Sequence, residues 1–470
     1  MSDADLAFTP ATELAEMIRL KKVSPVEVVD VYARRIEELN PMIGAYLTTT
    51  LDQAREHAKG AESRLAGNAD ELPPFFGVPI SIKDLNETKG VRTTHGCAAF
   101  HDRISTYDDE VVVRIKRAGF IMLGKTNTPE FGTTPFTDPP GYYPARNPWD
   151  TQRTTGGSSG GAAGALAAGL CPVSQGSDGG GSIRIPSSFC GLYGIKPSRG
   201  RVSHAPGGQS FLSQSGPIAR TVLDAAALLD AIAGYAPGDS WWAPPPERPF
   251  ADETGRPVGR LRVAVSADAP IEGSVAPANA EGARSAGRLL EQLGHDIVET
   301  SPPEWPAEVV EDFLVSWAVG TCGSDPMPPF ETLEPVNQAL IEFGRTVTAE
   351  RFQLAQARIR SASRTLVSFF EDFDALVTPT VAGPPPVIGS YRDPDQPLAE
   401  FLTAAALVPF TPPWNTTGQP AVSLPLHQDE DGLPVGVQIV GRPADEATLI
   451  RLSAQIEEAA PWADRRPPVS

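Results

Sequence analysis

The chain contains few of the residues that usually build metal centres and disulfide frameworks. Its 470 residues include only four cysteines and six histidines. The cysteines Cys97, Cys171, Cys190 and Cys322 form no CxxC pair and no Cys/His cluster with zinc spacing. We therefore expect no metal site and no cofactor. The cysteines should be reduced thiols, as in a cytoplasmic protein.

The chain also lacks an excess of positive charge and a long apolar run. Its formal net charge is -19, whereas a surface that binds nucleic-acid phosphates needs a basic patch. No apolar run reaches the roughly 18 residues of a membrane span, and the first residues do not resemble a signal peptide. We expect a cytoplasmic monomer or homodimer that binds a small molecule and has no nucleic-acid or membrane partner.

Short apolar segments alternate with helical patterns along most of the chain, which predicts an α/β fold. Ser24 followed by Pro25 and Glu27 marks a helix start, and Asn40-Pro41 is expected to end that helix. Residues 124–129 are expected to form a loop after a short strand. Strands are predicted at 78–82, 120–123, 261–265, 375–377 and 435–440, and helices at 109–118, 162–168, 221–232, 278–293 and through most of 309–370. The proline-rich residues 234–257 predict a surface connection that could serve as a lid or an interface.

Three segments carry the residues with the clearest chemical meaning. They are residues 77–84 (GVPISIKD) with Lys83, residues 156–161 (GGSSGG) with Ser158, and residues 176–184 (GSDGGGSIR) with Ser182. A serine after three glycines lies on backbone that can turn sharply and direct N–H groups at one point. Acyl transfer needs such a nucleophile beside an oxyanion hole, and a lysine in an apolar strand can serve as its base when burial lowers its pKa.

One interpretation of the glycine-rich segments is phosphate binding. A P-loop requires GxxxxGK followed by Ser or Thr, and a dinucleotide fold requires GxGxxG between a strand and a helix. Neither pattern occurs in the three segments, so we set phosphate binding aside.

A second interpretation is the nucleophile elbow of α/β-hydrolases, because residues 156–160 (GGSSG) match G-x-S-x-G. That elbow follows a buried strand, and we do not expect residues 150–155 (DTQRTT) to form one. The elbow also needs a histidine, and His204, His295 and His427 lie in no recognisable catalytic context. We therefore disfavour this interpretation as well.

The third interpretation is a serine–serine–lysine arrangement. Ser182 would be the nucleophile and neutral Lys83 the base, while Ser158 would relay protons between them and protonate the leaving nitrogen. Taken singly, Lys83 could be a surface residue and Ser182 a helix cap. The interpretation therefore depends on the joint order and spacing of all three residues.

With these motifs the sequence resembles the amidase signature family, from about Leu14 to about Trp462. The resemblance is densest between residues 77 and 200, and it includes residues 123–130 (LGKTNTPE), 191–197 (GLYGIKP) and 418–421 (GQPA). Lys83, Ser158 and Ser182 match the family's lysine, bridging serine and nucleophile. The resemblance therefore implies an amide hydrolase with a Ser–Ser–Lys triad.

The resemblance also implies the fold, a single α/β/α sandwich around a large mixed sheet that spans residues 1–470. We expect N-terminal helices (9–70), a signature core (71–232), a variable substrate region (233–375) and a C-terminal return to the core (376–470). The peptide bond between Gly157 and Ser158 is expected to be cis.

The resemblance further assigns supporting roles. The oxyanion hole is expected to comprise Gly179, Gly180, Gly181 and Ser182, and the residues that support its geometry are Ser159, Asp178 and Arg184. Many relatives carry a larger residue at position 179, so we expect a looser loop here.

The motifs do not select one substrate, because the family cleaves carboxylic amides and some members cleave esters, ureas or carbamates. Gly132, Thr133, Trp317 and Trp414 are expected to line the substrate pocket. Residues 135–143 form a loop rich in proline and aromatic residues. With apolar walls from Trp317 and Trp414, this loop favours an uncharged aryl or alkyl amide. For Cys322 a packed core position is favoured over a place in the cavity wall, and Trp414 has the same two possible positions. The C-terminal part resembles that of oligoamide hydrolases, so ester or carbamate cleavage is an expected side activity.

Two other functions share these motifs. The glutaminase subunit of a tRNA-dependent amidotransferase has the same triad, but the net charge of -19 and the divergent middle region disfavour it. A catalytically inactive binding relative is the other alternative, and the three intact catalytic positions argue against it.

Overall fold

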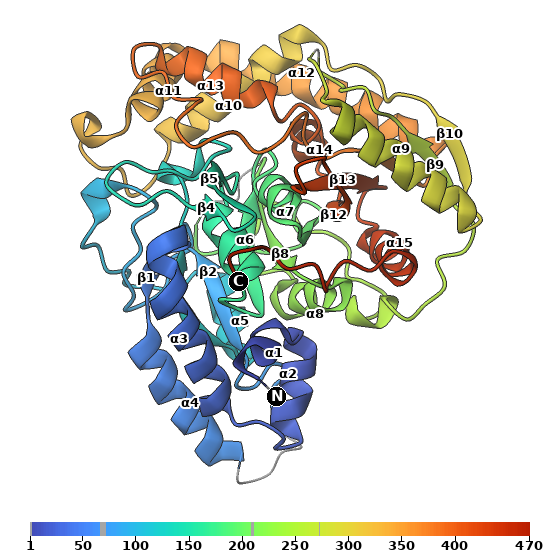
Figure 1. The fold of residues 1–470 in the computed structure, drawn as a ribbon. Helices are drawn as coiled ribbons and strands as arrows, with labels where there is room; N and C mark the ends of the chain where they lie inside the picture. The colour runs from blue at the N-terminus through green and yellow to red at the C-terminus, as the bar shows by residue number, and fades with distance from the viewer. Residues whose placement is uncertain (1, 66–71, 208–210, 272) are drawn as a thin grey trace.

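A mixed sheet of eleven strands crosses the protein and carries helices on both faces (Figure 1). The computed structural model describes residues 2–65, 72–207, 211–271 and 273–470. The strands of the large sheet are β1 (Tyr46–Thr49), β2 (Pro79–Lys83), β3 (Ile121–Thr126), β6 (Val173–Asp178), β7 (Tyr193–Lys196), β8 (Gln214–Ala219), β9 (Arg262–Val265), β10 (Asp296–Glu299), β11 (Ala375–Pro379), β12 (Ala421–Gln428) and β13 (Pro434–Gly441).

The strands lie in the order β1-β3-β2-β6-β8-β7-β12-β13-β11-β9-β10. Strand β2 is parallel to β3 and β6, and β9 is parallel to β10 and β11. The other neighbouring pairs are antiparallel. The predicted α/β fold with a large mixed sheet is therefore confirmed.

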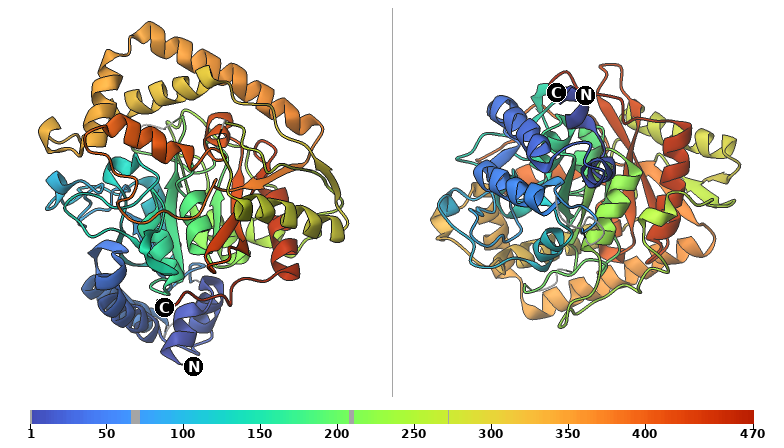
Figure 2. Two further views of the ribbon diagram at one scale, coloured as in Figure 1. Left: turned by 45° about the horizontal axis from the view of Figure 1, so that its top comes forward. Right: turned by 90° about the horizontal axis from the view of Figure 1, so that it is seen from below.

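Helices cover the sheet in groups that follow the chain. They are α1 (Asp3–Phe8), α2 (Ala11–Arg19), α3 (Pro25–Ile43), α4 (Leu51–Leu65), α5 (Glu110–Arg117), α6 (Gly160–Ala167), α7 (Arg184–Cys190), α8 (Val222–Ile232), α9 (Pro277–Gln292), α10 (Ala307–Cys322), α11 (Pro335–Thr346), α12 (Ala349–Ser368), α13 (Pro397–Ala406), α14 (Pro412–Thr417) and α15 (Glu446–Ala459). Helices α10–α13, here called the cap helices, lie together over one end of the sheet (Figure 2, left). The expected boundary between the N-terminal helices and the core, at residues 70 and 71, lies outside the described residues.

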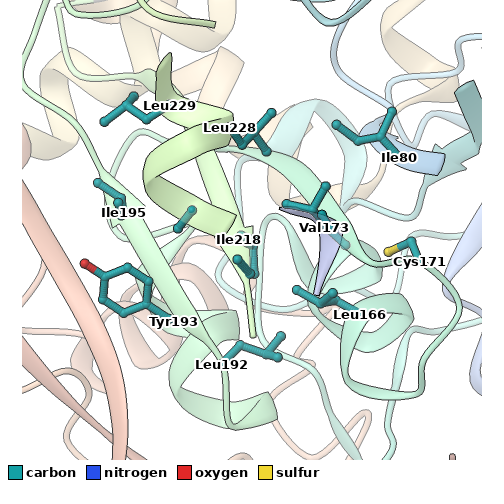
Figure 3. Close-up of a cluster of buried hydrophobic side chains, with 14 of the residues drawn as sticks. Ile80, Leu166, Cys171, Val173, Leu192, Tyr193, Ile195, Ile218, Leu228 and Leu229 are labelled. Atoms are coloured by element: carbon teal, nitrogen blue, oxygen red, sulfur yellow. The ribbon is translucent and has the colours of Figure 1, made fainter. Parts of the chain in front are cut away.

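The core is built where the central strands meet helices α6 and α8. Figure 3 shows Ile80 of β2, Val173 of β6 and Ile218 of β8 beside Leu166 of α6 and Leu228 of α8. All five side chains are buried. Burial of such side chains supplies most of the free energy that stabilises a fold of this size.

Helix α6 (GGAAGALA) is buried along its whole length because its side chains are so small. A Cβ atom added at Gly161 would lie only 2.2 Å from the backbone nitrogen of Asn127. This close packing brings the start of the helix, and the serines that precede it, against the strand ends. The small residues of α6 thus determine where Ser158 and Ser159 lie, because they allow the helix to pack close to its neighbours.

Three local predictions are wrong. Helix α3 continues through Pro41 and ends at Gly44, whose φ of 59° provides a left-handed cap with its N–H bonded to Asn40 O. Strand β3 runs through residues 124–126, because Gly124 and its neighbours pair with β1 and β2.

Residues 150–154 also form a strand, β5, against expectation. It pairs with β4 (Arg146–Asn147) in a separate two-stranded sheet, and most of its residues are only partly buried. Cross-strand pairing thus overrides the polar sequence. Strand β5 does not support the elbow interpretation, because a nucleophile elbow follows a strand of the main sheet and β5 is not part of that sheet.

Within the described ranges, no helix combines the length and apolar character needed to cross a bilayer. The same residues contain no group of three or more His, Cys, Asp or Glu side chains placed to hold a metal ion.

Candidate active site

Lys83, Ser158 and Ser182 come from three different elements and meet at one end of the sheet. Lys83 ends β2, Ser158 lies in the turn before α6, and Ser182 lies between β6 and α7. Lys83 Nζ is 2.7 Å from Ser158 Oγ. Ser158 and Ser182 line the same cavity, and the backbone N–H of Ser159 donates to Ser182 O at 3.2 Å. The peptide bond between Gly157 and Ser158 is cis, as the resemblance implied.

Burial sets the charge state of Lys83. The side chain is fully buried, and its other hydroxyl neighbour is Ser177, whose Oγ is 3.1 Å from Nζ. Burial lowers the pKa of Lys83 to about 7, while the negative charge of Asp178 partly opposes that shift. A substantial fraction of Lys83 is therefore neutral near neutral pH.

The carboxylate next to Lys83 in sequence is directed elsewhere. Asp84 accepts hydrogen bonds from the backbone N–H and the hydroxyl of Thr94, at 2.9 and 2.6 Å. Its other oxygen lies 3.3 Å from Nζ of Lys125, which is also fully buried. Lys125 thus compensates the charge of Asp84.

Asp178, at the end of β6, organises the turn that carries Ser182. Its carboxylate accepts hydrogen bonds from the backbone N–H groups of Gly181 (2.8 Å) and Ile183 (3.2 Å). Arg184 adds two side-chain hydrogen bonds of 2.9 Å each. Burial alone would raise the pKa of Asp178, but the charge and hydrogen bonds of Arg184 hold it well below its usual range. Asp178 and Arg184 therefore hold the two ends of the turn that carries Ser182.

Residues from the C-terminal part complete this network, and sequence reasoning did not assign them. Arg184 donates to Thr411 O (3.0 Å), Gln438 Oε1 (2.7 Å) and Asn415 Oδ1 (2.6 Å). Asn415 also donates to Asp178 Oδ1 at 2.9 Å. Only the position of Asn415 and Gln438 within segments that resemble the family could have indicated such a role.

The expected oxyanion donors divide into two groups. The N–H of Gly181 is engaged by Asp178, so the expectation that it joins the oxyanion hole is not met in this structure. Among the hydrogen bonds of the described residues, none engages the N–H of Gly179, Gly180 or Ser182. These three donors are therefore available to a ligand.

The loop at Gly179 packs against the cap helix α10. A Cβ atom at Gly179 would lie 3.3 Å from two ring carbons of Trp317, so the indole already fills the space that a side chain would need. Thr411 Oγ1 donates to Gly180 O at 2.6 Å and fixes the opposite side of the loop.

Ser159 couples the two serine-bearing turns. Its hydroxyl donates to Ser177 O at 3.1 Å and accepts from the backbone N–H of Ser177 at 3.2 Å. Because Ser177 precedes Asp178 in β6, this pair of bonds fixes the turn of Ser158 against the turn of Ser182.

Two cavities adjoin at Ser182, and Gly132, Thr133 and Trp317 line both. The first, here called the apolar cavity, is bounded mainly by Ile185, Phe313, Trp317, Phe401 and Val408. The second, here called the hydroxyl-lined cavity, includes Ser158, Ser177, Ser213, Ser316, Thr321 and Ser324. The space between their walls, including the part open to solvent, is about 430 Å³ for the first and 710 Å³ for the second. Every described residue that lines them is uncharged.

Trp414 does not join this site, so its predicted pocket role is corrected. The side chain is buried, and its ring contacts Phe370 edge-on with the centroids 5.9 Å apart. It belongs to a separate hydrophobic cluster, because helix α14 turns its indole toward α12 and the residues after it. Cys322 packs with Cys97, Leu333 and Ile341, which is the packed position that the sequence favoured.

The histidines considered for an elbow mechanism lie outside both cavities. His204, His295 and His427 are absent from the lining that the described residues form around Ser182. His295 Nδ1 instead accepts a hydrogen bond from the backbone N–H of Leu261 at 3.1 Å, and its Nε2 lies 2.8 Å from Gln455 Oε1.

Comparison with known proteins gives consistent results. The family model described as Amidase matches residues 27–450. The protein named "Putative amidase AmiB2" of Mycobacterium tuberculosis is 43% identical over 475 residues, which covers 100% of each chain. The solved structure of 6-aminohexanoate cyclic dimer hydrolase has a TM-score of 0.92 at 32% identity, and covers 98% of this chain and 99% of that one. A bacterial aryl acylamidase of the amidase signature family has a TM-score of 0.84 at 26% identity, with 97% of each chain covered.

The geometry of the Ser182 turn predicts different effects for two neighbouring glycines. Gly181 has a φ of 133°, and a Cβ atom there would lie 2.3 Å from Thr411 Oγ1 and 2.6 Å from Ile185 Cδ1. We expect Gly181→Ala to lower the free energy of unfolding by about 2 kcal/mol or more. Gly180→Ala is the matched control, because its nearest neighbour would be at 3.7 Å. Equal urea midpoints for the two variants would contradict this prediction.

Proposed function

The chain belongs to the amidase signature family of amide hydrolases, and from this premise we propose that it cleaves small uncharged amides through an acyl-enzyme on Ser182. The observation that carries the proposal is the contact of 2.7 Å between Ser158 and a lysine without solvent exposure. Such a lysine can accept a proton that a solvated, charged lysine could not.

In the proposed reaction Ser182 Oγ attacks the carbonyl carbon of the amide. Ser158 takes the proton from Ser182 and passes its own hydroxyl proton to the lone pair of Lys83. The N–H groups of Gly179, Gly180 and Ser182 stabilise the oxyanion. When the C–N bond breaks, Ser158 donates a proton to the leaving nitrogen and recovers one from Lys83.

The second half of the reaction reverses these roles with water as the nucleophile. Water loses a proton through Ser158 to Lys83 as its oxygen attacks the acyl carbon. The same proton then returns through Ser158 to Ser182 Oγ as the ester bond breaks. The carboxylic acid leaves, and Lys83 is neutral again.

The uncharged lining of both cavities supports an uncharged substrate. A buried ammonium or carboxylate without a partner is strongly unfavourable, so a free amino acid amide would bind poorly. One relative of known structure is named 6-aminohexanoate cyclic dimer hydrolase. The cyclic dimer in that name has no free amine or carboxylate, so it is an uncharged amide. We infer a fairly hydrophobic aryl or alkyl amide, with esters or carbamates of similar shape as side substrates.

The same lining disfavours a glutaminase subunit of an amidotransferase. Glutamine carries an ammonium and a carboxylate on one carbon, and neither cavity offers a described charged side chain to either group. An inactive relative is disfavoured because Lys83 contacts Ser158, and Ser158 and Ser182 line the same cavity.

Labelling with a fluorophosphonate tests the nucleophile. We expect a single adduct by intact mass, mapped to Ser182, and loss of the adduct in Lys83→Ala because Ser182 is no longer activated. Lys116→Ala is the matched control, since Lys116 is half exposed and pairs with Asp108 on the surface. An adduct on Ser158, or undiminished labelling in Lys83→Ala, would contradict the assigned roles.

The pH dependence tests the base. Lys83 accepts a proton only in its neutral form, so kcat/KM should fall about tenfold per pH unit below about pH 7 and level off above it. Lys196 requires a control, because burial also lowers its pKa to about 7. Its side chain lies outside both cavities, so the inflection should persist in Lys196→Met. A flat profile from pH 5.5 to 9 would rule out a titrating Lys83.

Two pairs of substrates test the inferred polarity. Hexanamide and 6-aminohexanamide share a six-carbon acyl chain, but only the second carries an ammonium group near neutral pH. We expect kcat/KM to be about a hundredfold higher for hexanamide, because the ammonium finds no counter-charge in either cavity. We expect 4-nitrobutyranilide to be cleaved and L-glutamine to be a poor substrate. A preference for glutamine would instead favour the amidotransferase alternative.

A further inference from the structure

Thr133 occupies a distinctive position in the site because it lines both cavities together with Ser182. Its neighbour Gly132 approaches Ser158 closely, and a Cβ atom at Gly132 would lie 3.1 Å from Ser158 Oγ. Under the proposed function, Ser158 protonates the leaving nitrogen. The segment that carries Thr133 therefore borders the place where the nitrogen of the substrate lies.

A buried glutamate fixes the orientation of the amide group behind Thr133. Glu130 and Asn337 are both buried, and Asn337 belongs to the cap helix α11. Glu130 Oε2 accepts from the backbone N–H of Glu334 at 3.0 Å. The nitrogen of the Asn337 amide lies 2.8 Å from Glu130 Oε2 and 3.3 Å from the backbone oxygen of Glu130.

Since the backbone oxygen of Glu130 can only accept, the amide nitrogen of Asn337 must face Glu130. The amide oxygen of Asn337 then faces Thr133, with Thr133 Oγ1 2.6 Å from Asn337 Oδ1. Among the residues that the structure describes, the other polar neighbour of this hydroxyl is Glu130 O, at 3.1 Å. Both neighbours are acceptors.

The hydroxyl proton of Thr133 is consequently committed to the protein. A hydroxyl has one proton and two lone pairs, so Thr133 can only accept a further hydrogen bond. The polarity of this oxygen is thus fixed by residues outside the two cavities. The Thr133 hydroxyl oxygen therefore favours a hydrogen-bond donor on the substrate and disfavours an acceptor.

We propose that Thr133 is a specificity-determining residue whose hydroxyl accepts a hydrogen bond from the N–H of the bound amide. This proposal rests on the proposed function. It adds a reason why the enzyme would prefer amides that carry an N–H to esters with the same acyl group. An amide that carries an N–H satisfies Thr133, whereas an ester or an N-alkylated amide offers no donor at that position. Asn337 and Glu130 act through Thr133 and are positioning residues.

The test compares an amide and an ester with the same acyl group, 4-nitrobutyranilide and 4-nitrophenyl butyrate. Both form the same acyl-enzyme, so kcat/KM reports the acylation step for each. In Thr133→Val we expect kcat/KM for the anilide to fall about tenfold, the usual effect of one lost hydrogen bond. The value for the ester should change less than about twofold, because the ester makes no such bond.

Three variants control the measurement. Thr133→Ser keeps the acceptor and should keep the ratio of anilide to ester activity. Thr134→Val removes the neighbouring hydroxyl, which donates to Phe136 O, and should change both substrates by the same factor. If Thr133→Val does not fold, Thr133→Cys replaces the hydroxyl by a weak acceptor and should lower the ratio in the same direction.

The outcomes separate this proposal from the proposed function. An equal loss for both substrates in Thr133→Val, or no loss, overturns the role of Thr133. Failure of the wild-type protein to cleave any anilide, despite acylation of Ser182, overturns the proposed substrate class instead. A wild-type protein that cleaves both substrates, with a ratio that falls only when the Thr133 hydroxyl is lost, supports both.

Discussion

The buried ion pair of Asp178 and Arg184 is the interaction on which the site depends. Both side chains are inaccessible to solvent. Each offsets the desolvation penalty of the other because the remaining groups of the carboxylate and the guanidinium are also hydrogen-bonded. The pair joins the end of β6 to α7 and, through Asn415 and Gln438, to the C-terminal part of the chain. Since Ser182 lies between Asp178 and Arg184, its position follows from this network.

The same network explains how a lysine can be buried without a strong counter-charge. Asp178 is the negative group that acts on Lys83, and Arg184 compensates it at 2.9 Å. Asp84 is compensated by Lys125 in the same way. Burial then dominates, and the pKa of Lys83 falls. Arg184 and Lys125 thus act on Lys83 indirectly, because each offsets the negative charge of a carboxylate close to it.

The sequence was informative where function requires short, glycine-rich motifs, and less so where long-range contacts decide. The spacing of Lys83, Ser158 and Ser182 predicted residues that the fold brings to one end of the sheet. Trp414 was misplaced because an apolar aromatic fits a core and a pocket equally well, and only the direction of α14 decides between them. The hydrogen bond from the N–H of Gly181 to Asp178 could not be predicted, because a glycine in a sequence does not indicate where its backbone N–H points. Strand β5 depends on pairing that its polar sequence does not reveal.

In the proposed reaction, reactivity and selectivity come from different parts of this chain, which meet at a few contacts. The signature core supplies Lys83 and both serines, whereas the cap helices supply Phe313, Trp317 and Phe401 to the apolar cavity. Trp317 fills the space beside Gly179, so the shape of the oxyanion loop depends on the cap as well. A substitution at Trp317 would therefore alter the cavity and the support of the loop together. This shared contact ties the selection of a substrate to the chemistry performed on it.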